Sequence, residues 1–287
     1  MEESISRLEL IKPILVCPRC GGGLDFHSDK ATCQECFADY PIRKGKIYFV
    51  EVPERADHLD QLKGRIKKWL GQHYYSIGVD ILAPTYPFNF SISIRRYLDP
   101  SRQIVVDAGC GNRRLDKDII CMDFFDYDVV DLVCDLNALP FKPNSVDAFI
   151  SRGLLEHLPF PSEVIRNFYR CTRPGGFNLH LVPFLFPFHA SPNDFHRYTH
   201  KGLELLFKDW RILEQTNITG PVTLGLIYII EFLSILMSLG HHRIKAYIYL
   251  FLCTILFPFK YLDTPFINRK SFLTLAPTIL TVMRKPD

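Results

Sequence analysis

The chain has 287 residues, 47% of them hydrophobic and 23% charged, so it is long enough for a large and a small domain and too apolar to be disordered. The formal net charge of +3 is too small to indicate a nucleic-acid partner bound through the overall field of the protein. The first residues lack the basic start and apolar stretch of a signal peptide, so we expect a cytoplasmic chain. In that reducing compartment the nine cysteines would be free thiols or metal ligands.

Four cysteines near the beginning of the chain have the spacing of a metal site. Cys17 and Cys20 form one C-x2-C pair, and Cys33 and Cys36 form a second pair after twelve intervening residues. Each pair brackets a tight turn, so four thiolates can surround one Zn²⁺ ion and leave no position for water or substrate. We therefore predict a structural zinc site that folds residues 1–52 as a small domain of its own, since so short a stretch cannot hold a core alone.

The stretch from about residue 10 to residue 52 resembles the zinc-ribbon domain of the small activator subunits of tRNA and protein methyltransferases. It carries Cys-Pro-Arg-Cys-Gly near its start, then Tyr40-Pro41-Ile42 and a closing apolar strand near residues 47–49. The alternative is four unrelated buried cysteines, although two C-x2-C pairs seldom coincide. His27 lies between the pairs and is expected at the surface.

Apolar, β-branched runs in the middle of the chain alternate with helical patterns. Residues 53–100 are expected to form a helical linker or cap, with Leu59, Leu62, Ile66 and Leu70 at helical spacing. After it, the alternation indicates an α/β fold, a doubly wound, Rossmann-like sheet with parallel strands. The strands are expected at residues 103–106, 119–122, 129–134, 145–150 and 177–184.

The first of these strands runs into a turn of small residues. Asp107, Gly109 and Gly111 lie in an acidic-x-Gly-x-Gly turn, where glycines let a ligand lie against bare backbone. The second strand ends at Asp123, an acid suited to hydrogen bonds with ribose hydroxyls. Only eleven residues separate Gly111 from Asp123, so we expect a short or irregular first crossover.

Four motifs follow one another across residues 101–217: D-x-G-C-G, L-P-F-x-x-x-S-x-D, L-E-H and P-G-G. Together they resemble the class I S-adenosylmethionine (SAM)-dependent methyltransferases of the small-molecule type. The resemblance implies SAM as the cofactor, with Asp107, Gly109 and Gly111 around its methionine part, Asp123 on its ribose, and Asp135 with the Leu136 backbone at its adenine edge. The alternative is that these acids are turn and cap residues.

The loop after the strand at residues 177–184 carries further candidate residues. It contains His189, Asp194 and His196 at the edge of the sheet where ligands bind, and the L-E-H motif adds His157. A hydroxyl acceptor must lose its proton, and histidine is suited to accept it near neutral pH. Which histidine acts as the base stays open, as does the simpler interpretation that Asp194 and Arg197 pair to hold the loop.

A late segment is strongly apolar. Residues 222–240 contain thirteen apolar residues in nineteen, and residues 246–259 contain twelve in fourteen. The second stretch is too short to cross a membrane, so we expect a helical hairpin at 222–262 lying in one leaflet, with basic residues at the headgroups. The alternative is that both helices cover the sheet or a dimer interface. The strand at residues 278–283 is expected to return to the sheet edge.

Three functions are compatible with these features. The leading one is a methyltransferase that acts on a small or lipid-linked acceptor, at a hydroxyl of a glycan or lipid intermediate, while associated peripherally with the inner face of the membrane. The second is an rRNA or tRNA methyltransferase, since some of these enzymes also carry a zinc ribbon. The third is a non-catalytic binding module with the SAM fold.

Overall fold

The computed structural model describes residues 7–52, 78, 81–189 and 193–287, so the helix expected around Leu59 to Leu70 lies outside the described residues. The α-helices are α1 (Arg7–Ile11), α3 (Phe90–Tyr97), α4 (Pro161–Cys171), α5 (His200–Leu206), α6 (Pro221–Ser238) and α7 (His242–Leu256). The 3-10 helices are η1 (Lys12–Ile14), η3 (Leu136–Ala138), η4 (Leu155–His157), η5 (Phe257–Asp263) and η6 (Lys270–Leu275). The strands are β1 (Leu24–Phe26), β2 (Lys30–Cys33), β3 (Asp39–Arg43), β4 (Lys46–Tyr48), β5 (Val105–Ala108), β6 (Ile120–Asp123), β7 (Leu132–Val133), β8 (Val146–Arg152), β9 (Thr172–Pro183), β10 (Arg211–Asn217) and β11 (Thr278–Arg284).

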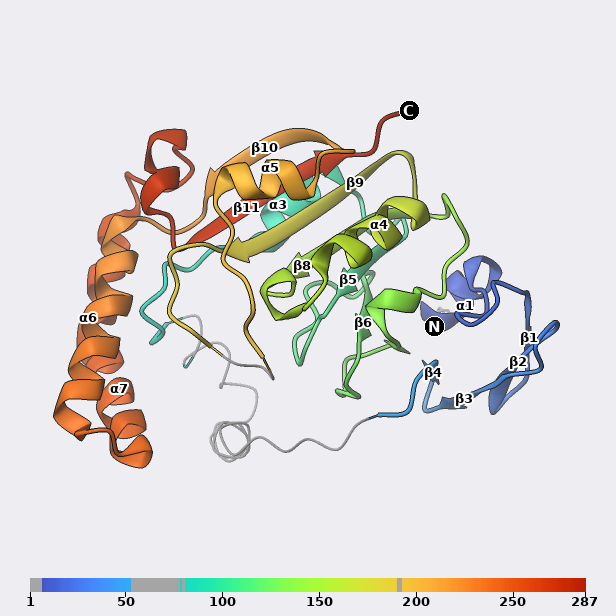
Figure 1. Cartoon of the computed structure of the whole chain (residues 1–287), viewed down its shortest axis with the longest axis horizontal. Helices are drawn as coiled ribbons and strands as arrows, with labels where there is room; N and C mark the ends of the chain where they lie inside the picture. The colour runs from blue at the N-terminus through green and yellow to red at the C-terminus, as the bar shows by residue number, and fades with distance from the viewer. Residues whose placement is uncertain (1–6, 53–77, 79–80, 190–192) are drawn as a thin grey trace, which may run out of the picture.

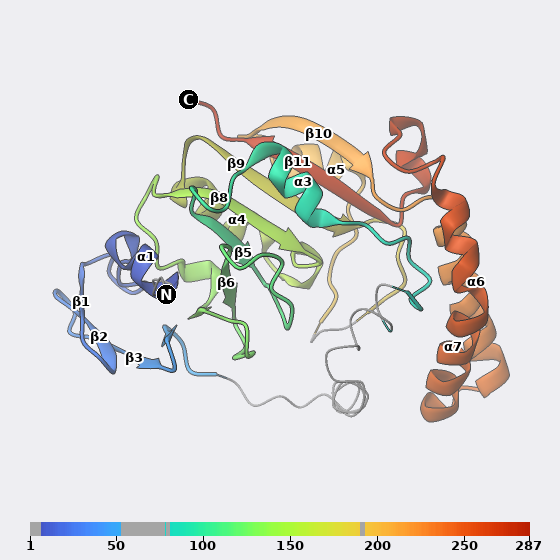
Figure 2. The ribbon, with the colours of Figure 1, turned by 180° about the vertical axis from the view of Figure 1, so that it is seen from behind.

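These strands form one sheet in the order β1-β2-β3-β4-β7-β6-β5-β8-β9-β11-β10. The central run from β4 to β9 is parallel. Helices α4 and α5 cover one face of the sheet and α3 covers the other (Figure 1, Figure 2). The predicted doubly wound, Rossmann-like sheet is therefore confirmed.

A separate apolar cluster fills each side of the sheet. Phe168 of α4 and Leu203 of α5 pack on one side, and Ile94 of α3 packs on the other. Because both faces are covered, every residue of β5 and β6 is buried, which explains why these strands are continuous apolar runs in the sequence.

The first crossover contains no helix. Residues 109–119, all of them described, pass from β5 to β6 as turns and loop, as the short spacing led us to expect. Arg114 holds this loop, because its guanidinium donates to both carboxylate oxygens of Asp131 at 2.9 Å and to the carbonyl of Ile119 at 2.6 Å.

The expectation that the last strand forms the sheet edge is wrong. β11 lies between β9 and β10 and is antiparallel to both. Residues 279–283 of β11 are all buried, as suits a strand with neighbours on each side, whereas β10 alternates exposed and half-buried residues along much of its length. β10 therefore forms the edge.

The cysteine-rich strands join the same sheet. β4 pairs with β7 in parallel, and the amides of Ile47 and Phe49 donate to the carbonyls of Asp131 and Val133 at 3.1 and 2.8 Å. Ile47 and Phe49 also belong to the apolar cluster that contains Met122 of β6. Residues 7–52 thus share both a sheet and a core with the rest of the chain.

Helices α6 and α7 form a hairpin at the end of the molecule opposite the cysteine-rich strands (Figure 1). Helix α6 and the longer helical stretch His242–Asp263, which joins α7 to η5, are long and apolar enough to cross a membrane, a test that core helices of soluble proteins also pass. Only 33% and 11% of their most apolar stretches are buried. The base of the hairpin is anchored by Asp263, which is fully buried and accepts from the amides of Gly220, Val222 and Thr223 at 3.1, 2.8 and 2.8 Å.

Candidate active site

The turn after β5 leaves backbone open to a ligand. Gly109 and Gly111 have φ angles of 67° and 59°, which favour glycine. A Cβ on Gly109 would lie 2.7 Å from Cδ1 of Leu154, so a larger residue does not fit there. Apart from Gly111 and its two chain neighbours, no atom of the described residues lies within 4 Å of the position that a Cβ on Gly111 would take, so this side of the turn has room for a ligand.

Asp107 lies at the start of this turn with its side chain fully buried. Its Oδ2 accepts from Nη2 of Arg152 at 3.2 Å, and its Oδ1 has no partner among the described residues. Burial raises the pKa of Asp107 to about 6, although the charge of Arg152 opposes this shift. A buried carboxyl with one unpaired oxygen is suited to a cationic group of a ligand.

Asp123 holds the turn against β6. Its Oδ2 accepts from the amide of Gly111 and its Oδ1 from the amide of Phe125, both at 2.9 Å. This positioning of the glycine turn was not expected from the sequence. The role of Asp123 on a ribose stays a prediction.

Asp135 and Leu136 lie at the carboxyl end of β7, on the same edge of the sheet. Oδ1 of Asp135 accepts from the amide of Asn137 at 2.9 Å and so caps η3. The carbonyl of Leu136 accepts from Nδ2 of Asn167 at 3.2 Å, which ties this turn to α4. Their role at an adenine edge stays a prediction.

Glu156, His157 and His189 form a cluster at the same edge. The carboxylate of Glu156 is 1% exposed, and its Oε1 lies 3.5 Å from Nε2 of His189 and 3.8 Å from Nε2 of His157. The contact with Glu156 raises the pKa of His189, so the cluster favours positive charge. Oε2 of Glu156 is buried and has no partner among the described residues.

Asp194 and Arg197 hold the loop that carries His189. Their side chains form a two-point ion pair, and Arg197 also donates to the carbonyl of Pro187 at 2.8 Å. The hydrogen bonds from Arg197 lower the pKa of Asp194 to about 2. Asp194 in turn accepts from the amide of His189 at 2.8 Å and lies 3.4 Å from its Nδ1.

The side chain of His196 lies outside the cluster of Glu156, His157 and His189. Its Nε2 lies 3.4 Å from the carbonyl of Pro159, and its ring lies beside Tyr198 at 5.6 Å between centroids. The structure thus brings His157, His189 and Asp194 together but does not add His196 to that group.

Sequence reasoning missed two residues of the site. Glu156 is the middle residue of the L-E-H motif, so the motif contained a signal for it that only burial makes decisive. Arg152 follows no recognisable pattern, and its contact with Asp107 depends on the pairing of β5 with β8.

The four cysteines converge at the other end of the molecule. Sγ of Cys17 lies 3.5 Å from Sγ of Cys36, and Sγ of Cys20 lies 3.4 Å from Sγ of Cys33. All four sulfurs lie within 4.8 Å of one another, which fits a tetrahedral Zn²⁺ ion with bonds of about 2.3 Å. His27 is exposed, as expected.

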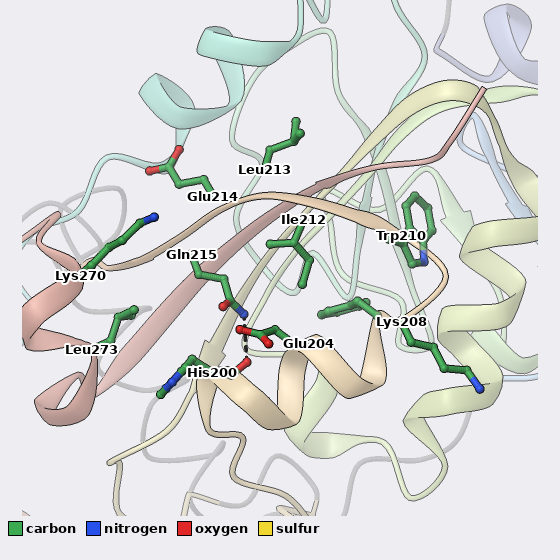
Figure 3. A pocket seen from close by; sticks show the side chains of 11 residues that line it. His200, Glu204, Lys208, Trp210, Ile212, Leu213, Glu214, Gln215, Lys270 and Leu273 are labelled. Carbon is green, nitrogen blue, oxygen red and sulfur yellow. Dashed lines mark hydrogen bonds between the residues drawn. The ribbon is translucent and has the colours of Figure 1, made fainter.

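A hollow of about 560 Å³ lies between α5 and β10 and is separate from this site. Figure 3 shows Glu204 and Gln215 among its lining residues, with Trp210 at one end. None of the residues predicted to bind a cofactor or to take part in catalysis lines it.

Comparison with known proteins identifies the central sheet. Residues 106–179 match the methyltransferase domain family. The chain carries a methyltransferase domain over these residues. A structure of Haemonchus contortus phosphoethanolamine N-methyltransferase 2 with SAM is similar over 87% of this chain and 62% of that chain, at 17% identity and a TM-score of 0.51, which shows a shared fold. No curated protein matches the chain.

Two further solved structures resemble the chain less closely. The Burkholderia thailandensis 1,6-didemethyltoxoflavin-N1-methyltransferase covers 92% of this chain and 99% of its own at 12% identity and a TM-score of 0.43. A complex of the Haloferax volcanii Trm112 methyltransferase activator with a putative methyltransferase covers 82% of this chain and 100% of its own at 17% identity and a TM-score of 0.44.

The residues of the turn fit SAM. The unpaired oxygen of buried Asp107 can accept from the amino group of the methionine part, and the open side of Gly111 leaves room beside the backbone. When bound, SAM supplies a methyl group on a positively charged sulfur that a nucleophile can displace.

Proposed function

We propose that this methyltransferase domain transfers a methyl group from SAM to a hydroxyl of a lipid-linked acceptor, a glycan or lipid intermediate, at a membrane surface. The observation that carries the proposal is the stretch from Arg152, the last residue of β8, to Glu156 of η4, which touches both the glycine turn and the histidine cluster. Arg152 contacts Asp107, Leu154 lies against Gly109, and Glu156 contacts His189. The glycine turn at residues 107–111 and the cluster of Glu156, His157 and His189 are therefore neighbours.

The cofactor would be held along the carboxyl edge of the sheet. Asp107, Gly109 and Gly111 are assigned to its methionine part, and Asp123 to its ribose. Asp135 and the Leu136 backbone are assigned to its adenine. All of these lie at or just after the carboxyl ends of β5, β6 and β7, where ligands of doubly wound sheets bind.

The acceptor hydroxyl would lie at Glu156, His157 and His189. These groups place a carboxylate and two imidazoles where a hydroxyl can be oriented and its proton withdrawn. Asp194 acts as a positioning residue for His189, because it contacts both the backbone amide and Nδ1 of that histidine.

The hairpin supports a lipid-linked acceptor. On α6 one exposed stripe at helical spacing is entirely apolar: Tyr228, Phe232, Ile235 and Leu236, each between 48% and 63% exposed. On α7 a similar stripe is formed by Tyr247, Leu250, Phe251 and Ile255, between 48% and 70% exposed. Apolar area of this kind, with Arg243 next to the turn between the helices, suits a helical pair lying in the membrane interface.

Several polar side chains of the hairpin have partners within it. Lys245 and Glu231 form an ion pair between the two helices at 2.5 Å, and Ser234 donates to the carbonyl of Ile230 at 2.6 Å. Such pairing lowers the cost of placing these groups next to lipid.

The hairpin also lies near the loop that carries His189. Because β10 runs parallel to β9, α6 begins at the same edge of the sheet as the loop that carries His189. The pKa of Arg197 is raised mainly by its hydrogen bonds to Asp194, with a smaller contribution from Tyr228 of α6. A lipid-linked acceptor held beside α6 would thus be close to the site.

We assign the four cysteines a structural Zn²⁺ ion. The ion would hold β1 to β4 in shape, so that β4 can pair with β7 next to the predicted adenine residues.

The test is to incubate the purified protein with methyl-labelled SAM and fractionated cell extract, then separate the lipid, glycan, RNA and protein pools. We expect label in the lipid pool that survives mild alkali, because a methyl ether resists hydrolysis and a methyl ester does not. Asp107→Asn is the inactive control. Label confined to RNA or protein would overturn the proposal.

A further inference from the structure

The Glu156, His157 and His189 cluster has the dimensions of a metal site. One ligand atom from each residue, Oε1 of Glu156 and a ring nitrogen of each histidine, lies within 4.8 Å of the other two. The contacts of 3.5 and 3.8 Å are longer than hydrogen bonds. They suit ligands around one ion, since bonds of 2.0–2.2 Å in a tetrahedron place ligand atoms about 3.4 Å apart.

The outer nitrogen of each histidine faces acceptors. Nδ1 of His157 contacts the carbonyl of Asn193, and Nδ1 of His189 lies 3.4 Å from Oδ2 of Asp194 and 3.3 Å from the carbonyl of Pro187. Nη2 of Arg197 is also 3.4 Å from Nδ1 of His189, but it makes shorter bonds to Asp194 and Pro187, at 2.5 and 2.8 Å. Both Nδ1 atoms therefore carry the proton.

With Nδ1 protonated, each neutral ring turns the lone pair of its Nε2 toward the carboxylate of Glu156. Three acceptors then meet with no donor between them, which is unfavourable unless a cation lies there. A proton shared between Glu156 and one histidine satisfies one contact, whereas a metal ion satisfies all three. Histidines that bind metal usually donate their other ring N–H to a carbonyl or carboxylate, as both do here.

The second oxygen of Glu156 gives independent support. Oε2 is buried and has no hydrogen-bond partner among the described residues, although a buried carboxylate is costly unless it is paired or binds a metal. The charge of Arg197 also acts on Glu156, but the guanidinium of Arg197 is engaged with Asp194.

We propose that Glu156, His157 and His189 bind a divalent transition-metal ion of the zinc, iron or manganese kind. Two imidazoles and one carboxylate suit such ions and leave coordination positions open. A further role rests on the proposed function: with the ion bound, the metal and not an imidazole would lower the pKa of a hydroxyl at an open position, and this hydroxyl would lose its proton to solvent near neutral pH. Binding of the metal does not depend on that role.

The test is the zinc content of the full-length protein after saturation with Zn²⁺ and removal of the excess. We expect two equivalents in the wild type, one in the four-cysteine site and one here. Glu156→Gln, which keeps the shape of the side chain, should bind one, and so should His189→Asn. His200→Ala, a histidine of α5 outside the cluster, should still bind two.

The second readout is thermal unfolding with and without added Zn²⁺ or Mn²⁺, each variant being shown to bind SAM as a check of folding. Added metal should raise the melting temperature of the wild type and not that of Glu156→Gln. One equivalent of zinc in the wild type, or two in Glu156→Gln, would overturn the metal site. Two equivalents without any methylated hydroxyl product would instead overturn the proposed function alone.

Discussion

Ile47 of β4 lies opposite Leu132 of β7 in a parallel pair, and this contact joins the cysteine-rich strands to the methyltransferase sheet. It is reinforced by the amide of Ile47, which donates to the carbonyl of Asp131 at 3.1 Å, and by Nε of Arg7, which donates to the carboxylate of Asp131 at 3.1 Å. Asp131 also binds Arg114 of the first crossover. One carboxylate thus links the beginning of the chain to the loop that follows the glycine turn after β5.

The first prediction follows from this shared sheet. Cys33→Ser should unfold the whole chain in one cooperative transition, with a free energy of unfolding that is lower by more than the ~1 kcal/mol typical of single substitutions. The sequence alone suggested that the ribbon would unfold by itself. His27→Ala, at an exposed histidine between the cysteine pairs, should unfold as the wild type does. Calorimetry showing two separate transitions in Cys33→Ser would contradict the prediction.

The second prediction concerns pH and Asp107. Because burial raises the pKa of Asp107 to about 6, the carboxyl is protonated below that pH and must lose its proton before it can bind the cationic part of SAM. SAM affinity should therefore be constant near neutral pH and fall below about pH 6, by up to about tenfold per pH unit.

The control for this pH dependence is Asp107→Asn, which has no carboxyl to titrate. It should bind SAM more weakly and with no such fall over the same range, as calorimetry at several pH values would show. Equal affinities of the wild type at pH 5 and pH 7 would show that Asp107 does not contact the ligand's charge.

The third prediction concerns the hairpin. The double variant Phe232→Glu, Phe251→Glu should bind anionic lipid vesicles at least tenfold more weakly in a sedimentation assay. The reason is that each phenylalanine that becomes buried in lipid contributes about 1.5–3 kcal/mol to binding. SAM affinity should not change. Leu205→Glu on α5 is the matched control, since Leu205 is 74% exposed but lies outside the hairpin. If Leu205→Glu weakened vesicle binding as much as the double variant, the hairpin would not be the membrane contact.

The central sheet could be predicted because local patterns define it. The apolar runs of β5, β6, β8 and β9 and the glycine turn depend on neighbours in the sequence, and so does the cysteine spacing. The place of β11 in the sheet could not be predicted, because it depends on which strands pair with β11 on each side. The pairing of β4 with the two-residue strand β7 leaves no periodic signal.

The candidate site was only partly predictable for the same reason. Asp107 and Gly111 stand out beside their strand, but the contact of Asp123 with the amide of Gly111 arises only when β5 and β6 pair. Glu156 differs from an ordinary surface acid because it is only 1% exposed. Its burial depends on the loop of residues 193–197, which packs over it and could not be placed from the sequence.

Calorimetric titration of SAM into the wild type and into Asp123→Ala tests the central claim most directly. We predict one-site binding by the wild type, and a loss in Asp123→Ala of at least tenfold, because charge-assisted hydrogen bonds are worth about 1.5–3 kcal/mol each and the carboxylate also holds the amide of Gly111. Absence of SAM binding by the folded wild type, or equal affinity in Asp123→Ala, would contradict the account.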